Sequence, residues 1–215
     1  MNRALWPIRG RGQPRGLDDG EAGDWSGRRV RADTSGMPVP PDLIADDQHL
    51  ERLVREGIGG AAVSVDIATA DLKAMLVPEH GGRSARSILR LLAEQAERGV
   101  EVRLLHAGVP SAAALDELRR ERPGRFTIRR CPRLHAKIVL IDSTELYLGS
   151  ANLTGAGMGA KAPTRRNFEL GLVTRDEPTI DAVSVYFNAI WEGDHCEGCG
   201  RRDVCPVPLE EPDLG

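Results

Sequence analysis

Residues 135–152 read HAKIVLIDSTELYLGSAN, and this stretch constrains the fold more than any other part of the chain. Two apolar runs, IVLI and LYL, stand on either side of the polar turn DST. Short apolar runs bounded by turn residues are typical of buried β-strands. The stretch therefore predicts a buried strand over 135–142 and a neighbouring strand over 145–150.

The rest of the chain from residue 41 onwards alternates between strand and helix patterns. Further strands are expected at 61–70, 100–105, 125–130 and 168–174. Helices are expected from a cap at Asp47 to the glycines at 57, 59 and 60, from Ser84 to Arg98 with Gly99 at the C′ position, from Ser111 to near Pro123, and from Glu177 to Trp191. Strands that alternate with helices predict an α/β layered domain, which we place at 41–192.

Residues 1–40 and 193–215 differ from this domain. The first segment is rich in Arg, Gly and Pro without hydrophobic periodicity, which predicts a disordered arm. The chain contains no apolar run of the roughly 20 residues that a membrane helix needs, and its first residues lack the apolar core of a secretory signal. We expect a cytoplasmic protein without a membrane partner.

Charge is distributed unevenly along the sequence. The net charge is −3, but residues 83–166 hold 16 basic and 8 acidic side chains, a net charge of +8. A basic segment suits a polyanion such as nucleic acid, although arginine-rich helices can also be a plain solvated surface.

The polar positions of 135–152 follow the pattern H-x-K-x4-D-x6-G-S-x-N. His135 and Lys137 are two residues apart on an expected strand, so their side chains leave the same face. The returning strand brings Gly149, Ser150 and Asn152 alongside. An imidazole, an ammonium group and an amide that converge in this way suit a phosphoryl group, because they offer a nucleophile and donors for the phosphate oxygens.

This pattern resembles the HKD signature of the phospholipase D superfamily. Six fixed residues match by chance about once in 10⁷–10⁸ starting positions at uniform residue usage. The resemblance extends over most of residues 50–190, and RNFELGL resembles the later N-x-E segment of the family, which gives Asn167 and Glu169. It implies a phospholipase D-like fold with a mixed central sheet flanked by helices on both faces.

The resemblance also implies roles. His135 is the expected nucleophile that forms a phosphohistidine, and Glu169 is the expected carboxylate that orients its ring. Lys137 and Asn152 are expected to bind phosphate oxygens, and Ser150 to support the cluster by hydrogen bonding. Asp142 is expected to be mainly structural, because it ends the strand of the nucleophile. Lys137 supplies positive charge, so no cofactor is expected for catalysis.

The chain carries this motif once. Family members use two such histidines, and none of the other four histidines is followed by x-K. The sequence therefore predicts a homodimer with one His135 from each subunit. It resembles the short single-motif bacterial nucleases of the superfamily.

Secondary contacts with the substrate are expected from basic side chains after the motif. Lys161, Arg165 and Arg166 are candidates for flanking phosphates, although a solvated loop fits the same residues. His106, which follows an expected strand, is either a site residue or an ordinary loop histidine.

The end of the chain holds a dense group of cysteines. Cys196, Cys199 and Cys205 suit a structural Zn²⁺ or an iron–sulfur cluster, with Cys131 as the better fourth ligand because His195 adjoins Cys196. Free thiols are the alternative.

These features predict a metal-independent phosphodiesterase that cleaves nucleic acid, with DNA as the expected substrate. A phospholipase or phosphatidyl transferase would use the same residues, and a non-catalytic nucleic-acid-binding subunit would retain the fold. The size and the ending of the chain resemble the DrmC-type component of DISARM anti-phage defence systems, which implies a role in antiviral defence with other defence proteins as partners.

Overall fold

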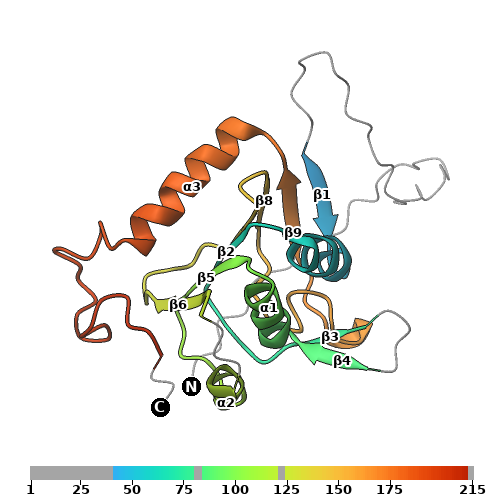
Figure 1. Ribbon diagram of the computed structural model, residues 1–215, viewed down its shortest axis with the longest axis horizontal. Coiled ribbons are helices and arrows are strands. Elements are labelled where there is room, and N and C mark those ends of the chain that lie inside the picture. Colours follow the sequence, from blue (N-terminus) through green and yellow to red (C-terminus); the bar gives the residue numbers. More distant parts are fainter. Residues whose placement is uncertain (1–40, 80–83, 121–123, 213–215) are drawn as a thin grey trace, which may run out of the picture. The chain divides into compact units, whose positions relative to one another are not determined.

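A seven-stranded mixed sheet organises the part of the chain that the structure describes. The computed structural model describes residues 41–79, 84–120 and 124–212, so the predicted arm at 1–40 lies outside the described residues. The strands run in the order β1-β9-β8-β7-β2-β5-β6 (Figure 1). Their bounds are β1 Asp42–Ala45, β2 Ser64–Thr69, β5 Glu101–His106, β6 Phe126–Arg130, β7 Ile138–Ile141, β8 Glu145–Gly149 and β9 Leu170–Thr174.

Parallel and antiparallel pairs divide this sheet. Strands β2, β5 and β6 are parallel neighbours, whereas β2–β7, β7–β8, β8–β9 and β9–β1 are antiparallel pairs. The helices are η1 His49–Ile58, α1 Ile88–Glu97, α2 Ala112–Arg120 and α3 Glu177–Trp191, with a short 3₁₀ helix η2 at Pro163–Arg165. A second sheet pairs β3, Leu76–Pro78, with β4, Ala85–Ser87.

Helices cover both faces of the large sheet, as expected. The helices η1, α1 and α2 pack on one face, and α3 packs on the other (Figure 1). In β7, Val139 and Ile141 belong to the first core, whereas Ile138 and Leu140 belong to the second. Successive side chains of a strand point to opposite faces, so a strand between two cores must be apolar throughout. This explains the run IVLI and confirms the predicted α/β class.

The predicted start of the second helix is wrong, whereas its end is confirmed. Ser84 hydrogen-bonds the Glu79 carboxylate, and the cap of α1 is Ser87, whose hydroxyl accepts from the amide of Arg90 at 3.1 Å. The residues between them form β4. Gly99 has a φ of +99°, and it closes the helix end as the C′ glycine.

The first helix begins differently from the prediction, whereas it ends among the predicted glycines, at Ile58 with Gly59 as the C-cap. It is a π-helix that begins at His49 after Gln48, and its N-cap makes no side-chain hydrogen bond. Asp47 is therefore not its cap and instead pairs with Arg166 at 2.5 Å. Gly57 lies inside the helix, where an added Cβ would stand 2.7 Å from Cδ1 of Ile141. The glycine lets the helix pack closely on β7.

The other expected elements are present with shifted bounds. The cap at Ser111 is confirmed, because its hydroxyl accepts from the amide of Ala114 at 3.3 Å. Strand β7 begins at Ile138 rather than 135, and β9 begins at Leu170 rather than 168. The strands β1, β3 and β4 were not expected. Among the described residues, no helix has both the length and the apolar character needed to cross a membrane.

Candidate active site

One edge of the large sheet gathers most of the predicted catalytic residues. Ile138 pairs with Leu148 of β8 and with Ala68 of β2, while Gly149 pairs with Gly171 of β9. The N-terminal ends of β7 and β9 and the C-terminal ends of β2 and β8 therefore meet at the same edge. The strand register alone brings residues from four separate segments together there.

His135 and Lys137 are in direct contact, although both precede β7. Nζ of Lys137 lies 3.3 Å from Nδ1 and 3.4 Å from Nε2 of His135, and it donates to the His135 carbonyl at 2.8 Å. The His135 side chain is exposed, while Lys137 is half-buried. Because an ammonium group can only donate, a ring nitrogen that bonds it is unprotonated. This contact therefore suits a neutral imidazole, one ring nitrogen of which accepts from the ammonium group.

Ser150 and Glu169 form a second pair at this edge. The Ser150 hydroxyl hydrogen-bonds a Glu169 carboxylate oxygen, and the other carboxylate oxygen accepts from Nδ2 of Asn167 at 2.9 Å. The amide of Leu170 donates to the Ser150 hydroxyl at 3.1 Å. Within the described chain, no hydrogen bond joins Glu169 to His135. The supporting role of Ser150 fits this geometry, whereas the orienting role of Glu169 stays a prediction.

Asn152 is held at the end of β2 by its side-chain oxygen. Its Oδ1 accepts from the amide of Asp71 at 3.2 Å and from the hydroxyl of Thr69 at 3.4 Å. Because the Asp71 amide can only donate, the oxygen of the Asn152 amide must face it. In the described part of the chain the Nδ2 group has no protein partner, so its N–H groups are available for phosphate oxygens.

Asp142 lies at the opposite end of β7 and does not join this cluster. Its carboxylate accepts from the backbone amides of Ala62, Val63 and Ser64 at 2.7–3.1 Å. Burial by itself raises the pKa of Asp142, but these backbone hydrogen bonds outweigh it and hold the pKa below its usual value. The geometry therefore fits the expected structural role.

The three predicted substrate-binding residues differ in availability. Lys161 and Arg165 have exposed side chains. Arg166 is half-buried, and its guanidinium pairs with Asp47 at 2.5 Å and donates to the Lys161 carbonyl at 2.8 Å. Arg166 therefore fixes the loop, and Lys161 and Arg165 are the side chains that a phosphate backbone could reach.

Tyr147 is a site residue that sequence reasoning missed. Its ring is buried, and a Cβ on Gly149 would stand 2.2 Å from its hydroxyl, while a Cβ on Gly171 would stand 2.2 Å from Cε2. The paired glycines thus make room for the ring beneath the site. Burial raises the pKa of Tyr147 to about 12, so it remains a neutral phenol. The signal was the Tyr-x-Gly spacing, which puts both residues on one face of a strand.

Two histidines lie buried at the same edge. His49 packs edge-on against Tyr147, with ring centroids 5.5 Å apart, and His106 pairs with Thr69 at the end of β5. Nδ1 of each contacts a backbone carbonyl, and Nε2 of each has no partner in the described structure. Burial lowers the pKa of both, so both are neutral near pH 7. Neither ring is exposed to substrate.

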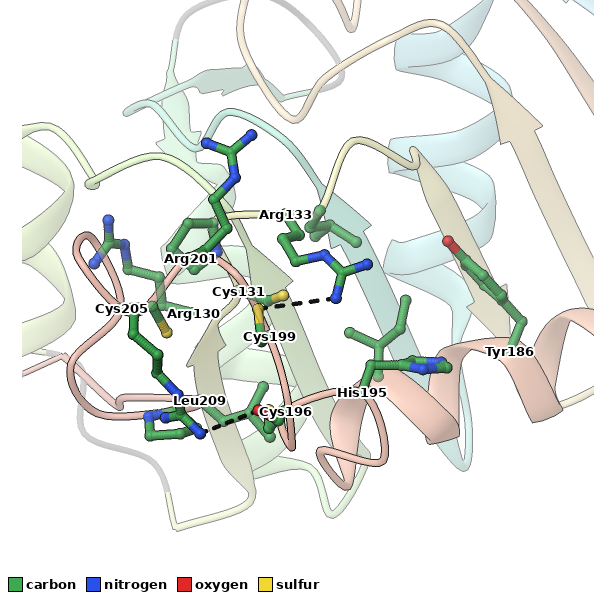
Figure 2. A pocket seen from close by; sticks show the side chains of 15 residues that line it. Arg130, Cys131, Arg133, Tyr186, His195, Cys196, Cys199, Arg201, Cys205 and Leu209 are labelled. Atoms are coloured by element: carbon green, nitrogen blue, oxygen red, sulfur yellow. Dashed lines mark hydrogen bonds between the residues drawn. The ribbon is translucent and has the colours of Figure 1, made fainter.

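All four cysteines line one pocket, which lies between the β6–β7 connection, α3 and the tail (Figure 2). They are free thiols. Among the described residues, no three His, Cys, Asp or Glu side chains are already arranged around a point that could hold a metal ion. The predicted metal site therefore stays a prediction.

Comparisons with known proteins agree with this architecture. Residues 54–191 match the family described as cardiolipin synthase, PLD-like domain. NucT from Helicobacter pylori is 19% identical with a TM-score of 0.53, and the match covers 71% of this chain and 95% of that one. Nuc from Salmonella typhimurium, described as a phospholipase D family member, is 18% identical with a TM-score of 0.52 and the same coverages. At these identities the likeness shows the fold. A comparison with curated proteins finds no match.

Proposed function

The chain belongs to the cardiolipin synthase, PLD-like domain family, and we propose that it is a metal-independent phosphodiesterase that cleaves nucleic acid, with DNA as the expected substrate. The observation that carries this proposal is the contact between His135 and Lys137 at the sheet edge that also holds Ser150 and Asn152. This edge offers an imidazole, an ammonium group and an amide, which suit the proposed attack on a phosphoryl group.

The proposed reaction has two displacements. A ring nitrogen of neutral His135 forms a bond to phosphorus while the bond from phosphorus to the leaving ester oxygen breaks. Lys137 and the amide of Asn152 stabilise the charge on the remaining phosphate oxygens. Water then attacks the phosphohistidine, the nitrogen–phosphorus bond breaks, and His135 is regenerated.

The leaving oxygen needs a proton, and the attacking water must lose one. Both tasks suit a second histidine on the far side of the phosphate. In the described residues the remaining candidates nearby, His49 and His106, are buried. We therefore assign the acid–base role to His135 of the partner subunit in a twofold homodimer.

An uncovered apolar strip next to the site supports this homodimer. Phe168 is 98% exposed and directly precedes Glu169. Leu170 and Leu43 are also exposed, and they lie on the same face of the sheet, since Leu43 pairs with Leu172 on β9. Exposed apolar residues that gather beside a functional site are typical of interaction surfaces. A partner that covers this strip would place its own site close to this one.

The proposal for the substrate rests on charge. Residues 83–166 carry a net charge of +8, and Lys161 and Arg165 are exposed after the motif. Basic side chains favour a phosphate backbone because binding releases condensed counterions. The description of the family favours a second candidate, a phospholipase or phosphatidyl transferase. A non-catalytic nucleic-acid-binding subunit of a defence complex is the third.

The deciding experiment incubates the purified protein with labelled DNA and, separately, with phospholipid vesicles, both in EDTA. We expect DNA cleavage that persists in EDTA and is lost in His135→Ala. Lipid turnover without DNA cleavage would establish the second candidate. Salt-sensitive DNA binding without any turnover would establish the third. A monomer that cleaves at the full rate would contradict the shared site.

A role in anti-phage defence, with other defence proteins as partners, stays a prediction from the DrmC resemblance. It is tested by phage plating on cells that carry the complete gene neighbourhood. We expect plaque numbers to rise when His135→Ala replaces the wild-type protein. Unchanged plaque numbers would show that defence does not depend on His135.

A further inference from the structure

The pocket lined by the cysteines joins two distant parts of the sequence. It has a volume of about 210 Å³, and its walls come from residues 130–134, from Tyr186 and Ile190 of α3, and from the tail. Figure 2 shows Cys131 and Cys199 near the centre of this hollow, with Cys196 and Cys205 around them. The full sequence has four cysteines, and all four line this pocket. Four thiols form the complete ligand set of a closed tetrahedral zinc site.

The backbone at Cys196 and Cys199 forms a tight turn. The amide of Cys199 donates to the Cys196 carbonyl at 3.3 Å, and Gly198 between them has a φ of +69°. Gly193, with a φ of +86°, leaves open the space in which a Cβ would stand 3.4 Å from Sγ of Cys196. The turn therefore presents both thiols of a C-x-x-C pair to the same pocket, as a metal knuckle requires.

Positive charge surrounds the thiols. Arg130, Arg133, Arg201 and Arg202 line the same pocket, and Nη1 of Arg133 lies 3.8 Å from Sγ of Cys199. Four thiolates around one Zn²⁺ carry a net charge of −2, and the arginines offset this charge. The Arg130 guanidinium also pairs with the Glu210 carboxylate at 4.0 Å, so part of this positive charge is already balanced by the tail.

The four thiols line one pocket, but among the described residues they do not yet surround one point. A change between staggered rotamers moves a cysteine sulfur by about 3 Å without moving the backbone. Rotations of this kind are the change that we expect when an ion binds. His195 also lines the pocket, but its neighbour Cys196 already supplies a ligand from the same turn.

Apart from the cysteines and Arg133, Arg130 and Leu209 connect the tail to the domain, and the Arg130 guanidinium donates to the Val204 carbonyl at 3.3 Å and pairs with Glu210 at 4.0 Å. Residues 193–212 form turns without a helix or strand. The amide of Arg130 donates to the Glu210 carbonyl at 3.0 Å, and Leu209 packs against the core under α3. A segment with so little apolar surface is commonly held by a metal or a disulfide. The β6–β7 connection that carries Cys131 reaches His135 four residues later.

From this arrangement we propose that Cys131, Cys196, Cys199 and Cys205 bind one structural Zn²⁺, which clamps the tail onto the segment that presents His135. The ion takes no part in the proposed phosphoryl transfer. It restrains residues 131–135, so it acts on the position of the nucleophile. The proposal is independent of the proposed substrate, because its readouts are metal content and stability.

The first test measures metal in the full-length protein purified without chelator. We expect about one zinc per chain by elemental analysis, and replacement with Co²⁺ should give the intense thiolate-to-metal absorption of a tetrahedral sulfur site. Removal of zinc by a strong chelator should lower the Tm, and added Zn²⁺ should restore it. This measurement uses the wild-type chain, so it does not depend on whether a cysteine variant folds.

The second test assigns the ligands. Cys131→Ser, Cys199→Ser and Cys205→Ser should each lower the zinc content at least about tenfold at a fixed free zinc concentration, because a thiolate ligand is lost. His195→Ala and Asp203→Asn, which change the same tail, should retain the full zinc content. Zinc loss in His195→Ala with retention in Cys131→Ser would overturn the four-cysteine assignment.

Other results would overturn the proposal itself. One is a wild-type protein that holds no zinc and takes up none from solution while its four thiols are free. Another is a disulfide between any of these cysteines in protein purified under reducing conditions. The third is iron with sulfide in place of zinc. Activity measured in the chelated protein then decides whether the clamp positions His135. A partial fall in kcat with unchanged DNA binding is expected, so that cleavage in a chelator continues at a lower rate.

Discussion

The two ends of strand β7 are parts of one motif, yet the structure uses them differently. At the N-terminal end His135 is exposed, and the polar contact of its ring in the described structure is with the Lys137 ammonium group. At the C-terminal end Asp142 accepts hydrogen bonds from three backbone amides, two just before β2 and one at its first residue, Ser64. One end keeps its polar groups available, and the other end uses them to hold the chain.

This difference teaches that the fixed spacing of the motif has two physical causes. The spacing from His135 to Asn152 is set by the strand register, because the residues must meet at one edge of the sheet. The spacing from Lys137 to Asp142 is set by the length of a strand that crosses the core. Variants at one end should therefore change turnover, and variants at the other end should change stability.

The largest effect is expected at the exposed end. His135→Ala should lower kcat for DNA cleavage by at least about 10³-fold, because the proposed nucleophile is lost. Its Tm should stay within about 1 °C of the wild type, since the ring has no buried contacts. His195→Ala, another exposed histidine, is the matched control and should retain activity. Full activity in His135→Ala would remove the distinction between the two ends.

The next effect tests the packing beneath the site. Gly149→Ala should lower the free energy of unfolding by about 1–3 kcal/mol, because its Cβ would stand 2.2 Å from the Tyr147 hydroxyl. Urea denaturation of the single variants and of the Gly149→Ala/Tyr147→Ala pair measures the coupling. We expect the glycine substitution to cost less when Tyr147 is already truncated. Gly60→Ala, where an added Cβ meets nothing within 4 Å, is the control. Strict additivity of the two substitutions would show that Tyr147 is not the obstacle.

A smaller effect concerns the two buried histidines at the sheet edge near His135. Burial lowers the pKa of His49 and of His106 in the folded state. Because the unfolded chain then binds more protons, the free energy of unfolding should fall as the pH drops below about 6.5, by up to about 1.4 kcal/mol per pH unit for each histidine.

The variants His49→Gln and His106→Gln isolate this effect. Each should flatten the dependence of stability on pH between 7 and 5, measured by urea denaturation. Gly60→Ala, which changes no titratable group, should leave the slope of the wild type. An unchanged slope in both glutamine variants would show that the buried rings are not the groups that take up the protons.

The smallest effect is expected at the Asp142 end. Asp142→Asn should lower the free energy of unfolding by about 1 kcal/mol at pH 7, because its hydrogen bonds lose the charge of the acceptor. Asparagine tolerates the φ of +53° at this position. The folded-state pKa of Asp142 is lowered, so its contribution is present above about pH 4 and is lost as the pH falls through the folded-state value.

The measurement compares the two proteins at pH 7 and pH 3, and Asp181→Asn on α3 serves as the control. The difference between wild type and Asp142→Asn should shrink at the lower pH, and kcat should change less than twofold. A large loss of kcat without a loss of stability would place Asp142 in the chemistry.

Much of the fold could be predicted because the relevant signals are local. The run IVLI can only be a strand between two cores, and Gly99 and Ser111 mark helix ends by their own backbone preferences. The cap at Ser87 was missed because Ser84 offers the same hydroxyl three residues earlier. Strand β4 covers Ala85–Ser87, so the chain is extended after Ser84 and the helix begins only after Ser87. The hairpin of β3 and β4 has no strong sequence pattern of its own.

The candidate site divides in the same way. The sequence predicts that His135 and Lys137 share a face, and it singles out Glu169 by resemblance. It does not show that Glu169 bonds Ser150, because that contact depends on the register of β9 against β8. Tyr147 was missed because its importance depends on two glycines in different strands, Gly149 and Gly171. The ion pair between Arg166 and Asp47 joins residues that are 119 positions apart in the sequence, so the sequence alone does not indicate it.

By itself the sequence determined the chemistry on offer: one histidine–lysine pair, one supporting amide, and a set of four cysteines split between the middle and the end of the chain. The tertiary structure decided which of these groups meet. Antiparallel register carried Lys137, Ser150, Asn152 and Glu169 to one sheet edge, and the path of the tail beside α3 carried all four cysteines to one pocket. Residue identity fixes what a side chain can do, whereas long-range backbone pairing fixes its neighbours, and a single sequence encodes that pairing only weakly.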